Sequence, residues 1–269
     1  MLLIIEALLL ILAALGQDSS ATAGQIFPLD MAPDSVDDQY AGCRDKMANL
    51  VKTKLLNNEL KNSPGFKTAW GKGVEFPKSK NNNLTKNHEI AIFVYSDSLV
   101  YEHFNRDTRR DKNQYKHGNY KWYSLYFLLT EAIRILTKTQ NQCMLTYRRT
   151  NVEFTKNVLN KEVRFGSFAS SSLSRDITRF GNVSCFEINT CEGADLTKYS
   201  KLPREKEVLI PPYEKFKVTA VKTRRDQQDL WCETVFTLKS TGTRSDLNCA
   251  LFKKPSKTKT KSYVLNNVL

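Results

Sequence analysis

Apolar residues recur at helical spacing in two long stretches of the first half of the chain. The spacing predicts an amphipathic helix between residues 38 and 60, and the clearest helix of the chain between residues 121 and 139. The apolar positions are Tyr40, Met47, Leu50, Val51 and Leu55 in the first stretch, and Trp122, Leu125, Leu129, Ile133 and Leu136 in the second.

Two shorter segments lie between these predicted helices. Residues 78–87 (KSKNNNLTKN) are polar and rich in turn formers, which indicates a loop. Residues 89–95 (EIAIFVY) form a short apolar run that is typical of a strand, although a buried helical turn has the same appearance.

After about Cys143 the pattern changes to short strand-like segments separated by Gly, Pro, Asn and Ser. Residues 214–221 alternate clearly, with Phe216, Val218 and Ala220 on one face. Helices in the first half and short strands in the second predict the α+β class. We find no internal repeat and no convincing linker, so nothing in the pattern divides the chain.

The two ends of the chain differ from the rest. Residues 1–23 are apolar and then small, which predicts a secretory signal peptide cleaved between Gly16 and Gly24. The alternative is a membrane anchor, but the run is shorter than the roughly 20 apolar residues of a span. Residues 253–269 predict a basic disordered tail without the apolar end of a GPI signal. We therefore expect an extracellular protein, secreted or retained in the ER or in granules, without stable membrane insertion.

Composition limits the partners. The chain has 41 Lys and Arg against 28 Asp and Glu, so its formal charge is +13 and attracts anions, unless the lysines only solubilise the surface. A nucleic-acid module fits this charge, but no motif of one is present, so we expect no nucleic-acid partner. No Cys or His cluster has zinc spacing, so we expect no metal. No glycine-rich dinucleotide fingerprint appears.

Six cysteines follow the predicted signal peptide, and an even number in a secreted chain indicates disulfides. The count alone does not choose among the possible pairings. Asn83 and Asn182 lie in glycosylation sequons.

Two carboxylates stand one residue apart in the segment Arg204–Phe216 (REKEVLIPPYEKF). In an extended chain the side chains of Glu205 and Glu207 share a face, where like charges repel. An exposed strand end with surface charges is the plain interpretation. The wider segment TCEGADLTKYSKLPREKEVLIPPYEKFKV, however, resembles the carboxylate segment of the arginine-specific ecto-ADP-ribosyltransferases.

Other segments carry the same resemblance in the same order. LTYRRT resembles the family's arginine strand and places Arg148, and RFGSFASSSL resembles its serine strand and places Ser170. LDMAPDSVDDQYAGC and YSDSLVYEHFNRDTRR resemble its opening and its middle helical region, so the resemblance covers essentially the whole mature chain.

The resemblance implies a catalytic domain over residues 24–252, with a helical N-terminal half packed on a mostly antiparallel β core that carries an Arg–Ser–Glu site. It implies an NAD(+)–protein-arginine ADP-ribosyltransferase that consumes NAD, or NADP, as a substrate and uses no recycled cofactor. Its partners would be NAD and acceptor proteins that carry arginine, and the chain would be a monomer.

The resemblance also assigns roles to the four central residues. Glu207 would stabilise the oxocarbenium-like ribose that forms when nicotinamide leaves. Arg148 would hold the NAD phosphates, and Ser170 would orient Glu207. Glu205 would orient the acceptor guanidinium and help to withdraw its proton. Repulsion between the two glutamates would raise one pKa, and the sequence does not indicate which.

Further contacts to NAD are implied for Tyr95, Ser167 and Ser200. The family usually has Gly after the motif arginine, whereas this chain has Arg149, which would either crowd NAD or add a second phosphate contact. The family's disulfides imply Cys43 with Cys249 and Cys143 with Cys191, which leaves Cys185 with Cys232.

Two other functions compete with this interpretation. An NAD glycohydrolase would use the same site with water as the acceptor, and Glu205 argues against hydrolysis as the main activity. A non-catalytic secreted basic protein would bind acidic surfaces and would not turn over NAD.

Overall fold

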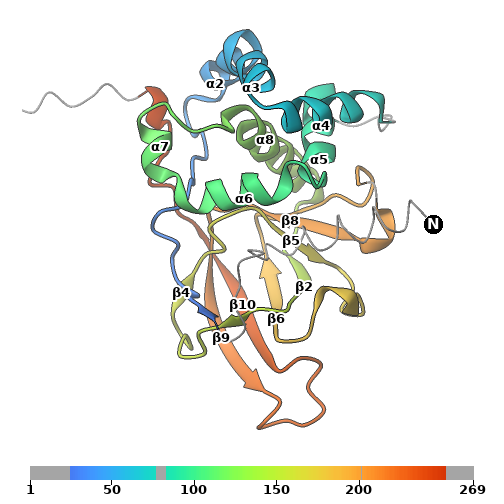
Figure 1. Cartoon of the computed structure of the whole chain (residues 1–269). Helices are drawn as coiled ribbons and strands as arrows, with labels where there is room; N and C mark the ends of the chain where they lie inside the picture. The colour runs from blue at the N-terminus through green and yellow to red at the C-terminus, as the bar shows by residue number, and fades with distance from the viewer. Residues whose placement is uncertain (1–24, 77–82, 201, 253–269) are drawn as a thin grey trace, which may run out of the picture.

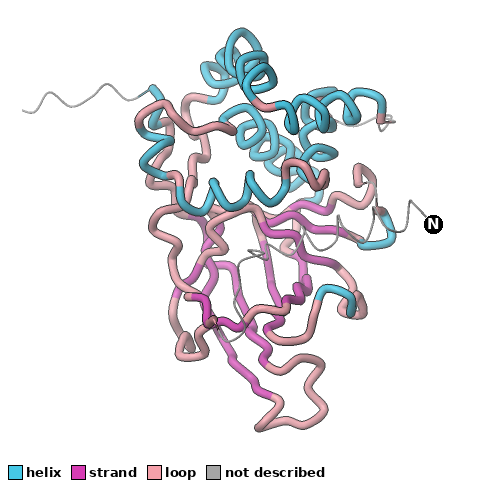
Figure 2. Tube along the Cα trace, viewed as in Figure 1, coloured by secondary structure: helices cyan, strands magenta, loops and turns pink. Residues whose placement is uncertain are grey.

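A layer of helices lies over an eight-stranded β-sheet (Figure 1), with the helical and strand regions clearly separated in space (Figure 2). The computed structural model describes residues 25–76, 83–200 and 202–252. The predicted signal peptide and basic tail lie outside the described residues. The predicted α+β architecture, with helices first and strands second, is confirmed.

The first predicted helix begins later than its apolar spacing suggested. It consists of α2 (Arg44–Leu50), a π-helical turn (Val51–Leu55) and α3 (Leu56–Asn62) in succession. Tyr40 and Gly42 have φ of 55° and 91°, left-handed values that interrupt a right-handed helix. The prediction of helix from residue 38 was therefore wrong by about two turns.

The apolar run at residues 89–95 is a helix and not a strand. It forms most of α5 (Lys86–Tyr95), and all of its residues from Glu89 to Tyr95 are buried. Thr85 caps the helix, since its Oγ1 accepts from the backbone N–H of His88, whose Nδ1 accepts from the Thr85 N–H. A helix buried on every side has no polar face, so it lacks the 3.6-residue periodicity that distinguishes helix from strand.

The remaining helices complete the upper layer. The predicted helix over 121–139 is confirmed as α8 (Tyr123–Gln140), which is buried over most of its length. It packs against α5, which in turn packs against α4. The other helices are α4 (Pro64–Glu75), α6 (Tyr101–Arg110) and α7 (Lys112–Lys116).

The main sheet has the strand order β4-β9-β10-β6-β2-β5-β8-β7. All neighbours are antiparallel except β10 and β6, so the predicted mostly antiparallel core is confirmed. A small parallel pair joins β1 and β3. The strands are β1 (Ile26–Phe27), β2 (Met144–Thr150), β3 (Glu153–Phe154), β4 (Glu162–Val163), β5 (Ala169–Ser172), β6 (Ser184–Thr190), β7 (Ala194–Asp195), β8 (Glu207–Ile210), β9 (Glu214–Thr223) and β10 (Thr234–Thr243).

The two faces of the sheet bury different cores. Leu209 belongs to the core of the helical layer, whereas its neighbour Ile210 belongs to the core on the other side. Phe168 and Ala169 divide in the same way, as expected for successive strand residues. The sheet therefore separates two apolar clusters, and its central strands are buried on both faces.

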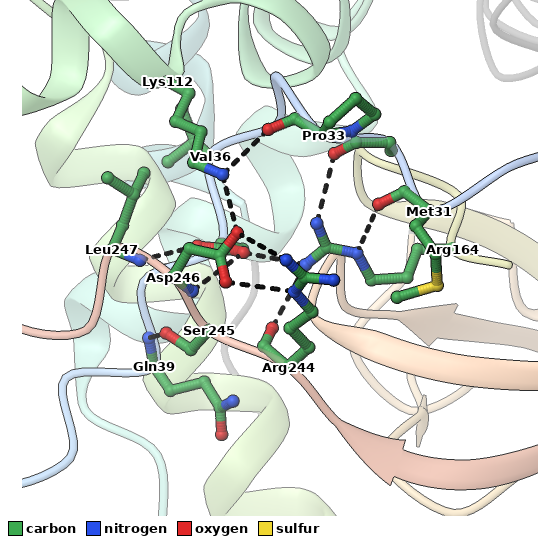
Figure 3. Close-up of polar contacts among 12 residues, drawn as sticks. Met31, Pro33, Val36, Gln39, Lys112, Arg164, Arg244, Ser245, Asp246 and Leu247 are labelled. Atoms are coloured by element: carbon green, nitrogen blue, oxygen red, sulfur yellow. Dashed lines mark hydrogen bonds and ion pairs between the residues drawn. The ribbon is translucent and has the colours of Figure 1, made fainter. Parts of the chain in front are cut away.

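A polar cluster joins the helical layer to the sheet (Figure 3). Arg164 and Asp37 form an ion pair of 2.8 Å in which both side chains are fully buried. Arg164 also donates to the backbone carbonyls of Met31, Ala32 and Arg244. Asp37 accepts from the backbone N–H groups of Asp246 and Leu247. Segments before the helices, after β4 and after β10 thus meet at one point.

The two disulfides implied by the family resemblance, Cys43–Cys249 and Cys143–Cys191, are present, and so is the pair left over, Cys185–Cys232. The first ties the segment before α2 to the end of the described chain. The second joins the start of β2 to the end of β6, and the third is fully buried beside Leu230 and Val235.

Two of these disulfides form a matched pair for a stability test. Their sequence separations are 48 for Cys143–Cys191 and 47 for Cys185–Cys232, so each restricts the unfolded chain to the same extent. We expect Cys143→Ala with Cys191→Ala to lower the free energy of unfolding by about 2–4 kcal/mol. Cys185→Ala with Cys232→Ala should cost more, because two fully buried sulfurs are also lost. Guanidinium unfolding of the oxidised proteins measures both, and equal losses would contradict the packing contribution.

Candidate active site

Three adjacent strands of the sheet bring the predicted trio together. Arg148 lies on β2, Ser170 on β5 and Glu207 at the start of β8, and these strands are neighbours in the order β2-β5-β8. The Arg148 guanidinium donates to the Ser170 carbonyl oxygen at 2.6 Å. All three residues line one pocket, which lies at the edge of the helical layer beside Tyr95 and Tyr101.

Glu207 has an unusual electrostatic environment for a carboxylate. Burial raises its pKa to about 7, and the charge of Glu205 adds to this rise. The Ser170 hydroxyl and the Arg148 guanidinium act in the opposite direction and lower the pKa. The Ser170 Oγ is buried and has no partner of good hydrogen-bond geometry among the described residues, so its interaction with the carboxylate is a loose one.

Glu205 lines the same pocket from a turn and not from the strand that the sequence suggested. It ends a 3₁₀ turn (η3, Pro203–Glu205), and Lys206 has a left-handed φ of 46° before β8 begins. The assumption of an extended chain between the two glutamates was therefore wrong, although both side chains line the pocket. Ser172 holds this turn, since its Oγ donates to the Glu205 carbonyl oxygen at 2.6 Å.

An arginine from another loop already pairs with Glu205. Arg179 lies in the 3₁₀ turn η2 (Thr178–Phe180), and its Nη2 donates to Glu205 Oε1. Burial raises the pKa of Glu205, and Arg179 lowers it in opposition. Phe180 of the same turn lines the pocket.

Arg149 holds the loop between β5 and β6 in place. Its Nε donates to the Arg175 carbonyl at 3.0 Å, and its Nη1 lies 3.4 Å from the Gly181 carbonyl. The guanidinium stacks on the Trp231 ring at 4.5 Å and is only 8 % exposed. The side chain that replaces the family's usual glycine thus lines the pocket while its guanidinium donates to backbone carbonyls and stacks on a ring, so it has a structural role at the edge of the site.

The three further contacts predicted for NAD lie in different environments. Tyr95 and Ser200 line the pocket, and the buried Tyr95 hydroxyl donates to the Phe168 carbonyl at 3.2 Å. Ser167 is buried at 2 % exposure, accepts from Arg109 and is not among the residues that line the pocket. A direct contact of Ser167 with NAD thus remains a prediction, and its visible role is to hold Arg109.

Several residues of the pocket were not predicted. The pocket is lined also by Tyr101, Tyr147, Arg175 and Phe180. Two further residues bind Glu205: Ser172 donates to its backbone carbonyl, and Arg179 donates to its carboxylate. Tyr147 directly precedes Arg148 on β2, where alternation of side chains predicts the opposite face, so the strand pattern did not point to it. Arg175 to Phe180 lie in a polar stretch without any motif, so only the folded chain brings them to the pocket.

The charges of the pocket suit a ligand that carries both signs. Two carboxylates lie near one another, and the guanidinium of Arg148 lies beside them. Such a site can accept phosphate oxygens at one end and stabilise a developing cation at the other. Over residues 25–76, 83–200 and 202–252, no group of three or more His, Cys, Asp or Glu side chains is placed to hold a metal ion.

Comparisons with known proteins identify the family of the chain. The family model "NAD:arginine ADP-ribosyltransferase" matches residues 29–242. The chicken NAD(P)(+)–arginine ADP-ribosyltransferase 2 is 36% identical over 236 residues, covering 84% of this chain and 73% of the relative. Human ecto-ADP-ribosyltransferase 5 is 33% identical over 265 residues, covering 91% and 88%.

A solved structure shares the fold. The eukaryotic mono-ADP-ribosyltransferase ART2.2 superposes with a TM-score of 0.70 at 29% identity, covering 84% of this chain and 100% of that one. A mutant of ART2.2 was also solved in complex with NAD, with a TM-score of 0.68. The chain belongs to the NAD:arginine ADP-ribosyltransferase family.

Within the described part of the chain, no helix is long and apolar enough to cross a membrane.

Proposed function

We propose that this protein is a mono-ADP-ribosyltransferase that transfers ADP-ribose from NAD to arginine side chains of proteins and releases nicotinamide. The observation that carries the proposal is the convergence of Arg148, Ser170 and Glu207 on one pocket from three adjacent strands, with Glu205 at the same pocket. Membership of the family supports the same activity.

The reaction needs one bond to break and one to form at the same ribose carbon. When the bond from C1′ to nicotinamide breaks, its electron pair goes to the pyridinium nitrogen, and positive charge develops on the ribose. The carboxylate of Glu207 stabilises that charge, and Arg148 holds the phosphates. A guanidinium nitrogen of the acceptor then attacks C1′ and loses a proton, so the products are ADP-ribosyl-arginine, nicotinamide and a proton.

NAD is consumed in this reaction and is not regenerated, so no separate cofactor is required. The pocket supports this role because Tyr95, Tyr101 and Tyr147 offer rings beside Arg148, where a nucleotide's base or nicotinamide can pack. The three disulfides fit an oxidising compartment, in keeping with relatives that are named ecto-enzymes. We propose an extracellular site of action on this basis.

The test uses oxidised protein that begins at residue 24, with NAD and agmatine as an arginine surrogate. Nicotinamide release and ADP-ribosylagmatine are followed by mass spectrometry. Formation of the adduct supports the transferase. Nicotinamide and free ADP-ribose without adduct would identify an NAD glycohydrolase, and folded protein that neither binds nor consumes NAD would favour a non-catalytic basic binding protein.

The pH dependence of the reaction should report Glu207. Since burial raises the pKa of this carboxyl to about 7, the free enzyme carries it mainly protonated below that pH. We expect kcat/KM for NAD to rise about tenfold per pH unit below pH 7 and to level off above it. Because the Glu205 charge raises this pKa, Glu205→Gln should move the inflection to lower pH. Stopped assays of nicotinamide between pH 5 and 9 measure both, and a flat profile would contradict the assignment.

A further inference from the structure

Arg179 presents to Glu205 the same chemical group that an acceptor would present. Its guanidinium donates to Glu205 Oε1, 26 residues away in the chain. Under the proposed function, that carboxylate receives the guanidinium of the acceptor arginine. The two cations need the same anion, so they cannot pair with it in the same way at the same time.

The surroundings of Arg179 allow its side chain to leave while its loop stays in place. The Arg179 side chain is 43% exposed, whereas that of Glu205 is 14% exposed, so the arginine lies on the solvent side of the pair. The loop itself is fixed at both ends of this turn, since Arg149 binds the carbonyls of Arg175 and Gly181. The Arg179 guanidinium also lies over the Phe180 ring, 4.8 Å from its centroid, so displacement of Arg179 requires a rotation of its side chain away from Glu205 and this ring, and no unfolding of the loop.

The other member of the ion pair, Glu205, is held in place through its backbone. Ser172 anchors the Glu205 backbone through its carbonyl oxygen, and the Leu173 N–H donates to the Lys206 carbonyl. Glu205 is thus a fixed carboxylate at the pocket, and Arg179 is a half-exposed cation that covers it. An ion pair of this exposure is weak enough for a free guanidinium to compete with it.

We propose that Arg179 is an internal competitor for the acceptor subsite, which an arginine acceptor must displace from Glu205 before transfer. The inference rests on the proposed function and adds a residue that sets acceptor affinity. Arg179 takes no part in binding or cleaving NAD under this proposal. Its removal should therefore change the KM for the acceptor and leave the KM for NAD unchanged.

The experiment compares Arg179→Gln and Arg179→Lys with wild type in the agmatine assay. We expect Arg179→Gln to lower the KM for agmatine about two- to fivefold, the upper part of the range that the loss of a surface ion pair corresponds to. The kcat of transfer and the KM for NAD should stay within about twofold of wild type. Arg179→Lys keeps a cation beside Glu205 and should lie between the two. Arg204→Gln is the matched control, because it removes an exposed arginine next to Glu205 that does not line the pocket.

Four outcomes would overturn the inference while leaving the transferase intact. The KM for agmatine could be unchanged in Arg179→Gln, or it could rise, which would make Arg179 part of acceptor binding. A lower kcat at constant KM would make Arg179 a positioning residue for Glu205. Peptide mapping after incubation with NAD alone could find ADP-ribose on Arg179, which would make it an acceptor. If wild type forms no adduct at all, the proposed function fails first, and the pair is only structural.

Discussion

Replacing Glu207 by glutamine is expected to lower nicotinamide release about a thousandfold or more, with transfer and hydrolysis falling together. Glutamine keeps the size of the side chain but carries no negative charge to stabilise the developing ribose cation. The loss should appear in kcat, because the charge that the carboxylate stabilises exists only in the transition state. The assay is nicotinamide release with and without agmatine, and retention of more than a tenth of the wild-type rate would contradict the role of Glu207.

The stability of the same variant separates lost chemistry from lost folding. The pKa of Glu207 is raised in the folded state, from 4.5 to about 7, so ionising this group destabilises the fold as pH rises through that interval. Glutamine does not ionise. We therefore expect Glu207→Gln to unfold at a higher temperature than wild type at pH 8, and at a similar temperature near pH 4.5. An inactive variant that is also more stable at pH 8 cannot owe its inactivity to misfolding.

Replacing Glu205 by glutamine is expected to separate transfer from hydrolysis. Formation of ADP-ribosylagmatine should fall about a hundredfold, because a neutral amide neither orients the guanidinium nor helps to withdraw its proton. Nicotinamide release should stay within about tenfold of wild type, since Glu207 and Arg148 are intact. Mass spectrometry of the ratio of adduct to free ADP-ribose measures the change.

The control for Glu205 is Glu233→Gln. Glu233 also pairs with an arginine, Arg224, but it is exposed and does not line the pocket. Its replacement should leave the product ratio unchanged. Equal losses of transfer and hydrolysis in Glu205→Gln would show that Glu205 serves NAD cleavage and not the acceptor.

Much of the fold could be predicted because the spacing of apolar residues shows which face of a helix or strand is buried. Residues 121–139 and 214–221 have apolar positions that match one face of a helix and of a strand, and both elements are confirmed. The strand interpretation of residues 89–95 was wrong because α5 is buried on every side. A pattern without a polar face does not distinguish a helix from a strand. The capping residues Thr85 and His88 were the signal that could have corrected it.

The sequence by itself determined the family and the class of fold, because these depend on motifs and on their order along the chain. The family resemblance implied two of the disulfides and pointed to Arg148, Ser170 and Glu207 as the site residues. Only the tertiary structure showed that a 3₁₀ turn brings Glu205 to the pocket, that Arg149 stacks on Trp231 and that Arg179 pairs with Glu205. Arg179 and Glu205 are 26 residues apart and share no local pattern. They meet because β5 and β8 are antiparallel neighbours in the sheet. The loop after β5, which carries Arg179, and the turn before β8, which carries Glu205, therefore lie at the same edge.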